Sequence, residues 1–128
     1  MAQMITKTDL KSKKNVLLAP HLAFEIGVQV SNTGVSTTNG KKIIPAGTPI
    51  GGTTSALTTR NAVLQVTNGS SNGANAQGVL RYDVDVTDGN ANATMIVFGF
   101  IDESKCPTID SAVKTALTKI TFVNGGKA

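Results

Sequence analysis

The residue types that most often carry catalysis are scarce in this chain. Its only histidine is His21 and its only cysteine is Cys106. Nucleophilic catalysis needs a nucleophile held beside a base and an orienting group, and no histidine lies in the segment around Cys106. We therefore interpret His21 as a surface or interface residue and Cys106 as a small buried or incidental side chain. The sequence predicts a protein that is not an enzyme, with no catalytic residue to assign.

A second chemical possibility is the acidic run DVDVTDG, which places Asp83, Asp85 and Asp88 close together. Convergent carboxylates suit hard cations such as calcium. The spacing does not fit an EF-hand loop, because the third aspartate falls at the sixth position and the twelfth position is Thr94. Asp83 and Asp85 are more simply the solvent face of a strand, and Asp88 the start of its turn. The sequence thus predicts no metal site and no cofactor.

The stretch IPAGTPIGG, residues 44–52, is rich in glycine, as phosphate-binding loops are. It lacks the Gly-Lys-Ser/Thr ending of a P-loop and no clear helix follows it, so nucleotide binding is not predicted. Its prolines and glycines instead favour a tight, specified bend. Nucleic-acid recognition is equally unsupported, because Arg60 and Arg81 are the only arginines and no aromatic residues alternate with basic ones.

The basic residues are concentrated near the beginning of the chain. The net charge is +4 and the pI is about 9.4. Four lysines lie within the first fourteen positions: Lys7, Lys11, Lys13 and Lys14. Residues 1–22 show no sustained hydrophobic period and are predicted to form an extended arm, which is either solvated or docks on an acidic partner. The apolar run at 16–19 is too short for a signal peptide or a membrane span, so we expect a protein made in the cytoplasm without membrane contact.

Alternation of apolar and polar residues predicts strands after the arm. The clearest is 24–30, where Phe24, Ile26, Val28 and Val30 share one face. Alternation with a weaker polarity contrast predicts a strand at 62–67. Alternation returns at 78–87 and predicts another strand, with Tyr82 pointing inward. Two dipeptides predict tight turns, Asn39-Gly40 between segments 35–38 and 41–44, and Asp88-Gly89 after the strand at 78–87.

The last third of the chain contains the expected core. Residues 93–101, ATMIVFGFI, are almost continuously apolar, as in a strand covered on both faces, in a sheet centre or under a neighbouring subunit. The apolar spacing from Ile109 to Ile120 predicts an amphipathic helix capped by Thr108 or Asp110, followed by a short final strand, KITFV. The small polar residues 67–77 are predicted to form a flexible surface loop.

Together these patterns predict a mainly β fold. We expect a compact β-sandwich or barrel-like domain with one short C-terminal helix and an extended N-terminal arm. The arm is assigned to residues 1–22 and a single β-rich domain to residues 23–128. A chain of 128 residues is long enough for one core, which must consist mainly of Val, Ile, Leu and Ala because aromatic residues make up only 4%.

Three segments in this order resemble the head decoration, or capsid cement, proteins of tailed phages. They are IPAGTPIGG, then GVLRYDVDVTDGNANATMIVFGFID, then a short helix and TKITFV. The resemblance spans about residues 42 to 123. The arm and the Asn-rich loop at 67–77 have no counterpart in it. The positions that carry the resemblance are Gly47, Thr48, Gly51, Gly78, Val79, Leu80, Asp83, Val84, Gly89 and Gly99.

This resemblance implies a structural virion protein with no cofactor. It implies a β-rich protein, commonly a homotrimer, on the outer face of an assembled capsid at three-fold and quasi-three-fold points. Its partner would be the major capsid protein, and each copy would bridge neighbouring coat subunits and stabilise the head. The protein would be made in the host cytoplasm and end on the outer surface of the virion, with no nucleic-acid or membrane partner.

Two sets of residues are candidates for these contacts. The lysines of the arm, Lys7, Lys11, Lys13 and Lys14, would contact acidic surface on the coat protein. The second set, for packing between subunits, lies in the long apolar segment and consists of Ile96, Phe98 and Phe100.

Two other classes of function stay open. The first is a displayed carbohydrate- or host-surface-binding β module, and the loop at 67–77 is the feature that supports it. Against it, tryptophan is absent and an inward Tyr82 leaves few stacking platforms for sugars. A small hydrolase would need a pocket that brings His21 together with Asp or Ser residues.

Overall fold

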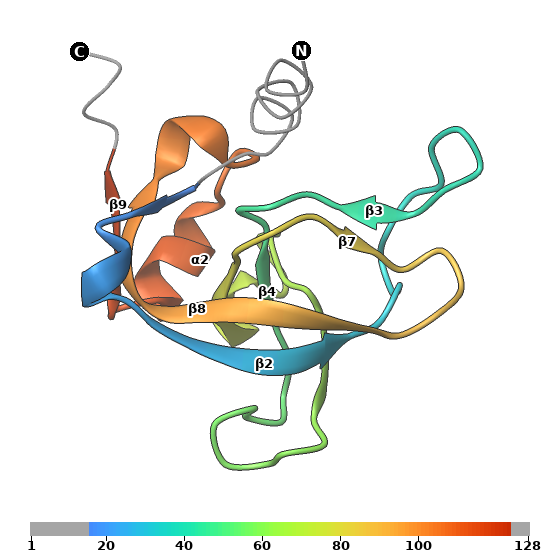
Figure 1. Ribbon diagram of the computed structural model, residues 1–128, viewed down its shortest axis with the longest axis horizontal. Helices are drawn as coiled ribbons and strands as arrows, with labels where there is room; N and C mark the ends of the chain where they lie inside the picture. Colours follow the sequence, from blue (N-terminus) through green and yellow to red (C-terminus); the bar gives the residue numbers. More distant parts are fainter. Residues whose placement is uncertain (1–15, 124–128) are drawn as a thin grey trace, which may run out of the picture.

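The computed structural model describes residues 16–123, and the four arm lysines lie outside this range. The predicted mainly β fold is confirmed: the strands form a barrel with a short extension, and one short α-helix packs beside it (Figure 1). The strands are β1 (Leu17–Leu18), β2 (Phe24–Val30), β3 (Ile43–Ile44), β4 (Pro49–Gly51), β5 (Val63–Val66), β6 (Ala76–Leu80), β7 (Val84–Asp85), β8 (Ala91–Asp102) and β9 (Ile120–Val123). The helical segments are α2 (Ser111–Ala116) and the 3-10 turns η1 (Pro20–Leu22), η2 (Gly73–Asn75) and η3 (Glu103–Lys105).

The barrel closes around the middle of β8. Met95 pairs with Ile26 of β2 on one edge and with Leu80 of β6 on the other. β2 continues the ring through a parallel pairing with β5, and β4 joins β5 to β6 by antiparallel pairings. The closed order is therefore β8-β2-β5-β4-β6, which leaves none of these strands with a fully unpaired edge.

The far end of β8 carries a separate extension. Beyond Gly99, whose φ is 150°, β8 pairs with β1 in antiparallel fashion and with β9 in parallel fashion. Val16 and Leu17, which were expected in the extended arm, are fully or almost fully buried here. A short apolar run that is too small to span a membrane is long enough to form one strand, and burial of its side chains stabilises that pairing.

Adjacent residues of β8 enter two different cores. Met95 belongs to the cluster inside the barrel, with Leu64, Leu80 and other residues. Ile96 belongs to the cluster between the sheet and α2, with Val113 and other residues. Both side chains are completely buried. The expectation that this segment is covered on both faces is thus confirmed for its middle.

The short helix follows the predicted pattern. It begins after Asp110, whose Oδ1 accepts a hydrogen bond from the backbone amide of Ala112 at 2.9 Å, as an N-cap does. Val113 is fully buried and anchors the helix to the core. The predicted strand after it is present as β9.

The segment 67–77 was predicted as a flexible projecting loop. It is a surface loop as far as Asn75, but the prediction that it projects was wrong. Thr67 and Gly73 are buried, and η2 packs directly against α2. A Cβ at Gly73 would lie 3.0 Å from the Cβ of Ala112, so the absence of a side chain permits this close approach. Small polar residues are compatible with a packed turn when their backbone groups find partners nearby.

The Asn39-Gly40 turn is as predicted, but its flanking strands are short. Asn39 and Gly40 both have positive φ, 54° and 78°, and Thr38 and Lys41 exchange backbone hydrogen bonds across them. Only Ile43–Ile44 continues as a strand, and it pairs with β7 in a small two-stranded sheet.

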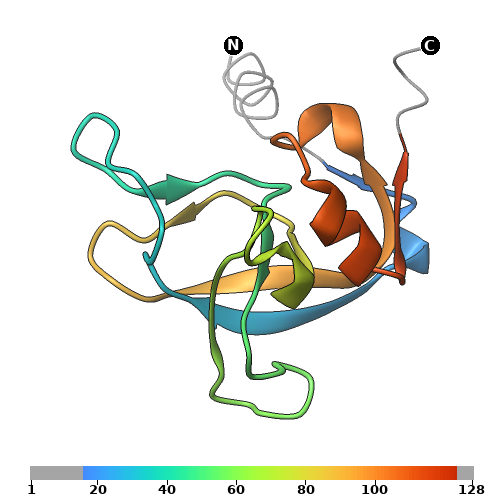
Figure 2. The same ribbon diagram turned by 180° about the vertical axis from the view of Figure 1, so that it is seen from behind.

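The described chain begins and ends at the same end of β8. The amide of Asp102 donates to the carbonyl of Val16 at 2.8 Å, and Asp102 is also the register partner of Val123. Figures 1 and 2 both show the green loop between β4 and β5 on the side of the molecule away from the tip of β9. The fold therefore has one end where the terminal segments attach and an opposite end formed by that loop and β2.

Candidate functional site

The residues that could do acid–base or nucleophilic chemistry are used in other ways. His21 is exposed on η1. The Sγ of Cys106 lies 3.5 Å from the carbonyl oxygen of Asp102 and packs so closely on Gly47 that a Cβ there would lie 2.7 Å from it. Within residues 16–123, no group of three His, Cys, Asp or Glu side chains is arranged to hold a metal ion.

The three aspartates of the acidic run do not converge. Asp83 Oδ1 accepts a hydrogen bond from the backbone amide of Ala46 at 2.7 Å, and therefore fixes the glycine-rich bend rather than facing only solvent. Asp85 Oδ1 accepts from the hydroxyl of Thr87 at 2.5 Å and from its amide at 2.9 Å. The Thr87 side-chain hydrogen bond, followed by the backbone one, lowers the pKa of Asp85 below its ordinary value.

The two longest segments of the resemblance lie against each other. Besides the bond from Ala46 to Asp83, the amide of Gly47 donates to the carbonyl of Leu80 at 2.8 Å, and the amide of Leu80 donates to Thr48 at 3.0 Å. Gly47 has a φ of 90°, which an L side chain rarely adopts. The glycine-rich bend is thus a structural element that joins β4 to β6.

The candidate packing residues of β8 divide between core and surface. Ile96 is completely buried within the chain and has no surface to offer a neighbour. Phe98 and Phe100 are 46% and 39% exposed. Together with Phe24, at 56%, they put three of the chain's four phenylalanines on the surface. Tyr82, predicted to point inward, is also exposed, with the Arg81 guanidinium 5.2 Å from its ring centre.

A β-bulge lies beside two of these rings. Phe24 pairs with Phe98 and Glu25 pairs with Ile96, so Val97 is an extra residue on β8. A bulge breaks the alternation of faces and increases the local twist. Phe24, at the beginning of β2, is exposed, whereas Val28 and Val30, at alternate positions of the same strand, are buried. A register shift of this kind depends on pairing between distant segments, and no signal within 24–30 could have revealed it.

Phe24 and Phe98 line one end of a surface groove. This apolar hollow has a volume of about 510 Å³ and includes Leu57, Val97, Leu117 and Lys119. A neighbouring hollow of about 440 Å³ shares Phe24 and Leu57 with it and extends along β2 to Gly27 and Arg60.

A third hollow, of about 490 Å³, shares Gly27 and Arg60 with the second and forms the polar end of the groove. It is lined by three amide side chains as well as Arg60, and these are Gln29, Asn61 and Asn92. Gln29 and Asn92 are register partners on adjacent strands. A Cβ at Gly27 would meet no atom within 4 Å, so this glycine leaves open space along the groove.

The three hollows adjoin one another along β2, because neighbouring hollows share lining residues, and they face the loop between β4 and β5. We call them together the β2 groove. The groove is not predicted from the sequence. The available signal is Gly27 in the middle of a strand, because glycine there often marks a close approach or an open surface.

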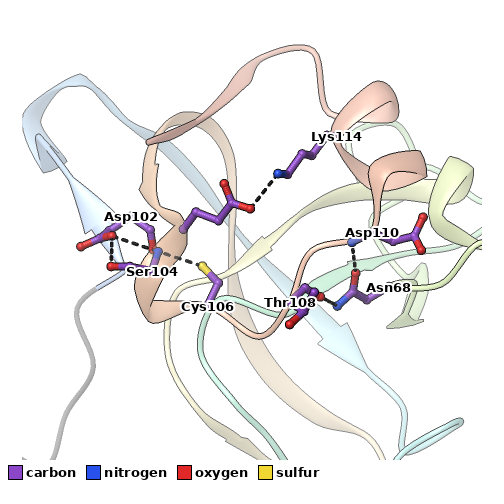
Figure 3. A network of polar contacts seen from close by, with 8 residues as sticks. Asn68, Asp102, Ser104, Cys106, Thr108, Asp110 and Lys114 are labelled. Carbon is purple, nitrogen blue, oxygen red and sulfur yellow. Dashed lines mark hydrogen bonds and ion pairs between the residues drawn. The ribbon is translucent and has the colours of Figure 1, made fainter. Parts of the chain in front are cut away.

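Polar contacts hold the turn at the other end of β8 (Figure 3). Asp102 Oδ1 accepts from the hydroxyl of Ser104 at 2.6 Å, and this hydrogen bond is the main cause that lowers the pKa of Asp102. Lys114 forms an ion pair at 2.7 Å with Glu103 of η3. These contacts order the end of the fold at which Val16 and Val123 lie.

The charge of the chain is divided unequally. Residues 16–123 contain seven basic and seven acidic residues, so their formal net charge is zero. The basic residues are Lys41, Lys42, Arg60, Arg81, Lys105, Lys114 and Lys119, and the acidic ones are Glu25, Asp83, Asp85, Asp88, Asp102, Glu103 and Asp110. The terminal segments, 1–15 and 124–128, contain five lysines and one aspartate, which accounts for the entire net charge of +4.

Among the described residues, no helix is both long and apolar enough to cross a membrane. The chain matches no protein-family model, and no curated protein is similar to it at a significant level.

Proposed function

We propose that this protein is a structural component of a phage virion that binds the outer surface of an assembled capsid and stabilises the head. The observation that carries the proposal is the charge distribution. A neutral β-barrel is joined, at one end of β8, to terminal segments that hold the whole net positive charge. Such an arrangement suits attachment of one end of the protein to a large acidic surface.

The lysines of the N-terminal segment supply the attachment in this proposal. Acidic groups on the major capsid protein are contacted by Lys7, Lys11, Lys13 and Lys14. One copy of the protein bridges neighbouring coat subunits. Binding to the assembled shell alone stabilises that shell by RT ln(1 + [L]/Kd) at each site. Many sites on a symmetric shell multiply this effect without any catalytic group.

Association into a trimer on the shell uses exposed apolar surface of β8. Phe100 is the first candidate for this contact, because it is exposed, lies on the end of β8 nearest the terminal segments and does not line the β2 groove. Phe98 is the second candidate. Sedimentation velocity at micromolar concentration tests whether trimers form before binding. If the protein is a monomer in solution, the trimer can form only on the shell.

The test of capsid binding is to mix the purified protein with mature shells that lack it and to image them by electron cryomicroscopy. Density at three-fold positions is expected, and bare shells with folded protein in excess would reject the proposal. A variant with Lys7, Lys11, Lys13 and Lys14 changed to Gln should bind at least about tenfold more weakly at low salt.

A charge-matched control separates the arm from general electrostatics. It changes four lysines of the described fold to Gln, namely Lys41, Lys42, Lys105 and Lys119. Occupancy close to that of the unchanged protein is expected for this control. Equal loss in the two quadruple variants would show that net charge, and not the arm, governs attachment.

A displayed carbohydrate-binding module is the second candidate function. The loop at 67–77 no longer supports it, because that segment is packed against α2. The exposed aromatic rings of the β2 groove favour it instead, since they supply stacking surfaces for sugar rings.

A further inference from the structure

We propose that the β2 groove is a binding site for an acidic oligosaccharide. The inference does not depend on capsid attachment and applies to the protein in solution. It rests on the residue types that line the groove and on the absence of acidic side chains among them.

The apolar end of the groove offers a platform for sugar rings. Phe24 and Phe98 lie opposite each other on β2 and β8, and both rings are about half exposed. Leu57, 63% exposed, faces them from the loop between β4 and β5. A sugar ring has an apolar face of C–H groups that packs on such rings, and its burial there removes apolar surface from water on both partners.

The polar end offers hydrogen-bonding groups that the fold itself does not use. Gln29, Asn61 and Asn92 each carry two N–H donors and one carbonyl acceptor, which matches hydroxyl groups that both donate and accept. No side-chain hydrogen bond to another described residue occupies any of the three. Their planar amides are therefore available to a ligand that lies along β2.

The charge of the groove selects an anion. Arg60 lines two of the three hollows and forms no ion pair within residues 16–123. Lys119 lies at the apolar end, and no Asp or Glu lines any of the three hollows. A guanidinium binds a carboxylate through two parallel hydrogen bonds, so a sugar acid is better matched than a neutral sugar.

An acidic peptide is the competing occupant. Peptides that bind to sheets gain most of their affinity from main-chain hydrogen bonds at an unpaired strand edge. β2 is paired with β8 along one edge, but with β5 only at Gln29 and Val30, so residues 24–28 have no partner among the described strands on the groove side. The three amide side chains and Arg60 favour a ligand recognised through hydroxyl and carboxylate groups, and the acidic peptide control separates the two occupants.

The polar end of the groove lies away from the terminal segments. Asn92 is separated from Asp102 by ten residues of β8, roughly 30 Å along the strand at the usual rise. A protein held on a surface by its terminal segments would leave the polar end of the groove accessible.

Isothermal titration calorimetry of the full chain tests the proposal. The probes are oligogalacturonate, hyaluronan fragments and oligosialate, with a maltooligosaccharide of the same length as the neutral control and a polyglutamate peptide as the acidic peptide control. At least one carboxylated sugar is expected to bind with a Kd at least about tenfold lower than both controls. No binding of the three carboxylated sugars at millimolar concentration, or equal binding of the neutral sugar or the peptide, would overturn it.

Two matched pairs of variants locate the site. Gly27→Val places a side chain into the open space of the groove, whereas Gly52→Val adds the same group at another open position outside the three hollows. Arg60→Gln removes the cation of the groove, and Lys105→Gln removes one outside it. Gly27→Val and Arg60→Gln should each raise the Kd at least about tenfold, while the two controls leave it unchanged. Binding that is insensitive to Gly27→Val, with circular dichroism showing an intact fold, would place the ligand elsewhere.

Discussion

The side chain of Asn68 holds the start of helix α2 through two hydrogen bonds, one of which it accepts and one of which it donates. Its Oδ1 accepts from the backbone amide of Asp110 at 3.0 Å, and its Nδ2 donates to the carbonyl of Thr108 at 2.7 Å (Figure 3). Asp110 is the N-cap of the helix, so Asn68 satisfies the backbone amide of the capping residue and the backbone carbonyl two residues before it. The Asn-rich segment is thereby tied to α2.

Replacement of Asn68 by Ala should destabilise the fold. Two hydrogen bonds are lost and a partly buried amide is left without its partner, which together cost about 1–2 kcal/mol. Chemical denaturation followed by circular dichroism measures the change. Asn75→Ala is the control, because Asn75 is exposed and its side chain makes no hydrogen bond to another described residue. Equal effects in the two variants would contradict the role given to Asn68.

The elements that could be predicted from the sequence are those determined by local pattern. β2 alternates, α2 has an apolar stripe behind a capping aspartate, and the Asn39-Gly40 turn needs only two residues with positive φ. Each of these features depends on neighbours along the chain. The interactions that form them are short-range, so sequence alone was sufficient.

The parts that could not be predicted depend on pairing between distant segments. Phe24 is exposed although it shares the alternation of Val28 and Val30, and its pairing with Phe98 is shifted by the extra residue Val97 on β8. The exposure of Tyr82 follows from the break between β6 and β7, where the amide of Arg81 donates to the carbonyl of Thr94 at 3.0 Å. The partners of Phe24 and Arg81 both lie in β8, so they cannot be found from the segments that contain Phe24 and Arg81. For the same reason the β2 groove, which combines side chains of β2, β8 and a loop, was not predicted.

Two adjacent glycines at the end of β4 should respond very differently to alanine. A Cβ at Gly51 would lie 2.1 Å from the backbone oxygen of Asn75, whereas a Cβ at Gly52 would meet nothing within 4 Å. Because the obstacle at Gly51 is backbone that is paired in the barrel, Gly51→Ala should cost about 3 kcal/mol. Gly52→Ala should leave the free energy of unfolding nearly unchanged. Thermal unfolding of the two variants side by side decides this, and similar melting temperatures would refute it.

The pH dependence of stability should contain a contribution from Asp85. Its folded pKa is depressed below the ordinary value of 3.8, chiefly by the side-chain hydrogen bond from Thr87 and then by the backbone one. A depressed pKa means that the folded state favours the ionised carboxylate. This stabilisation is complete above the unfolded pKa and is lost as the pH falls through the folded pKa.

Asp85→Asn isolates that contribution, because the amide keeps an acceptor oxygen but loses the charge. The variant should melt at a lower temperature than the unchanged protein at pH 7, and the difference should shrink as the pH falls below about 4. Asp88→Asn, in the following turn, is the control, since Asp88 makes no side-chain hydrogen bond to another described residue. A difference that grows on acidification would have the wrong sign for this mechanism.

The ion pair between Arg81 and Glu25 should contribute little, although it joins the two neighbours of β8 in the barrel. Both side chains keep about a quarter of their surface exposed, at 21% and 25%, so water and salt screen the attraction. A double-mutant cycle with Glu25→Gln and Arg81→Gln should give a coupling of about 0.5–1 kcal/mol at low salt, and less in molar salt. Arg81→Gln alone should cost more than Glu25→Gln alone, because the guanidinium also lies over the ring of Tyr82. In a Tyr82→Leu background, Arg81→Gln and Glu25→Gln should cost the same stability. A larger cost of Arg81→Gln that persists in this background would show that it comes from the packing of the Arg81 stem.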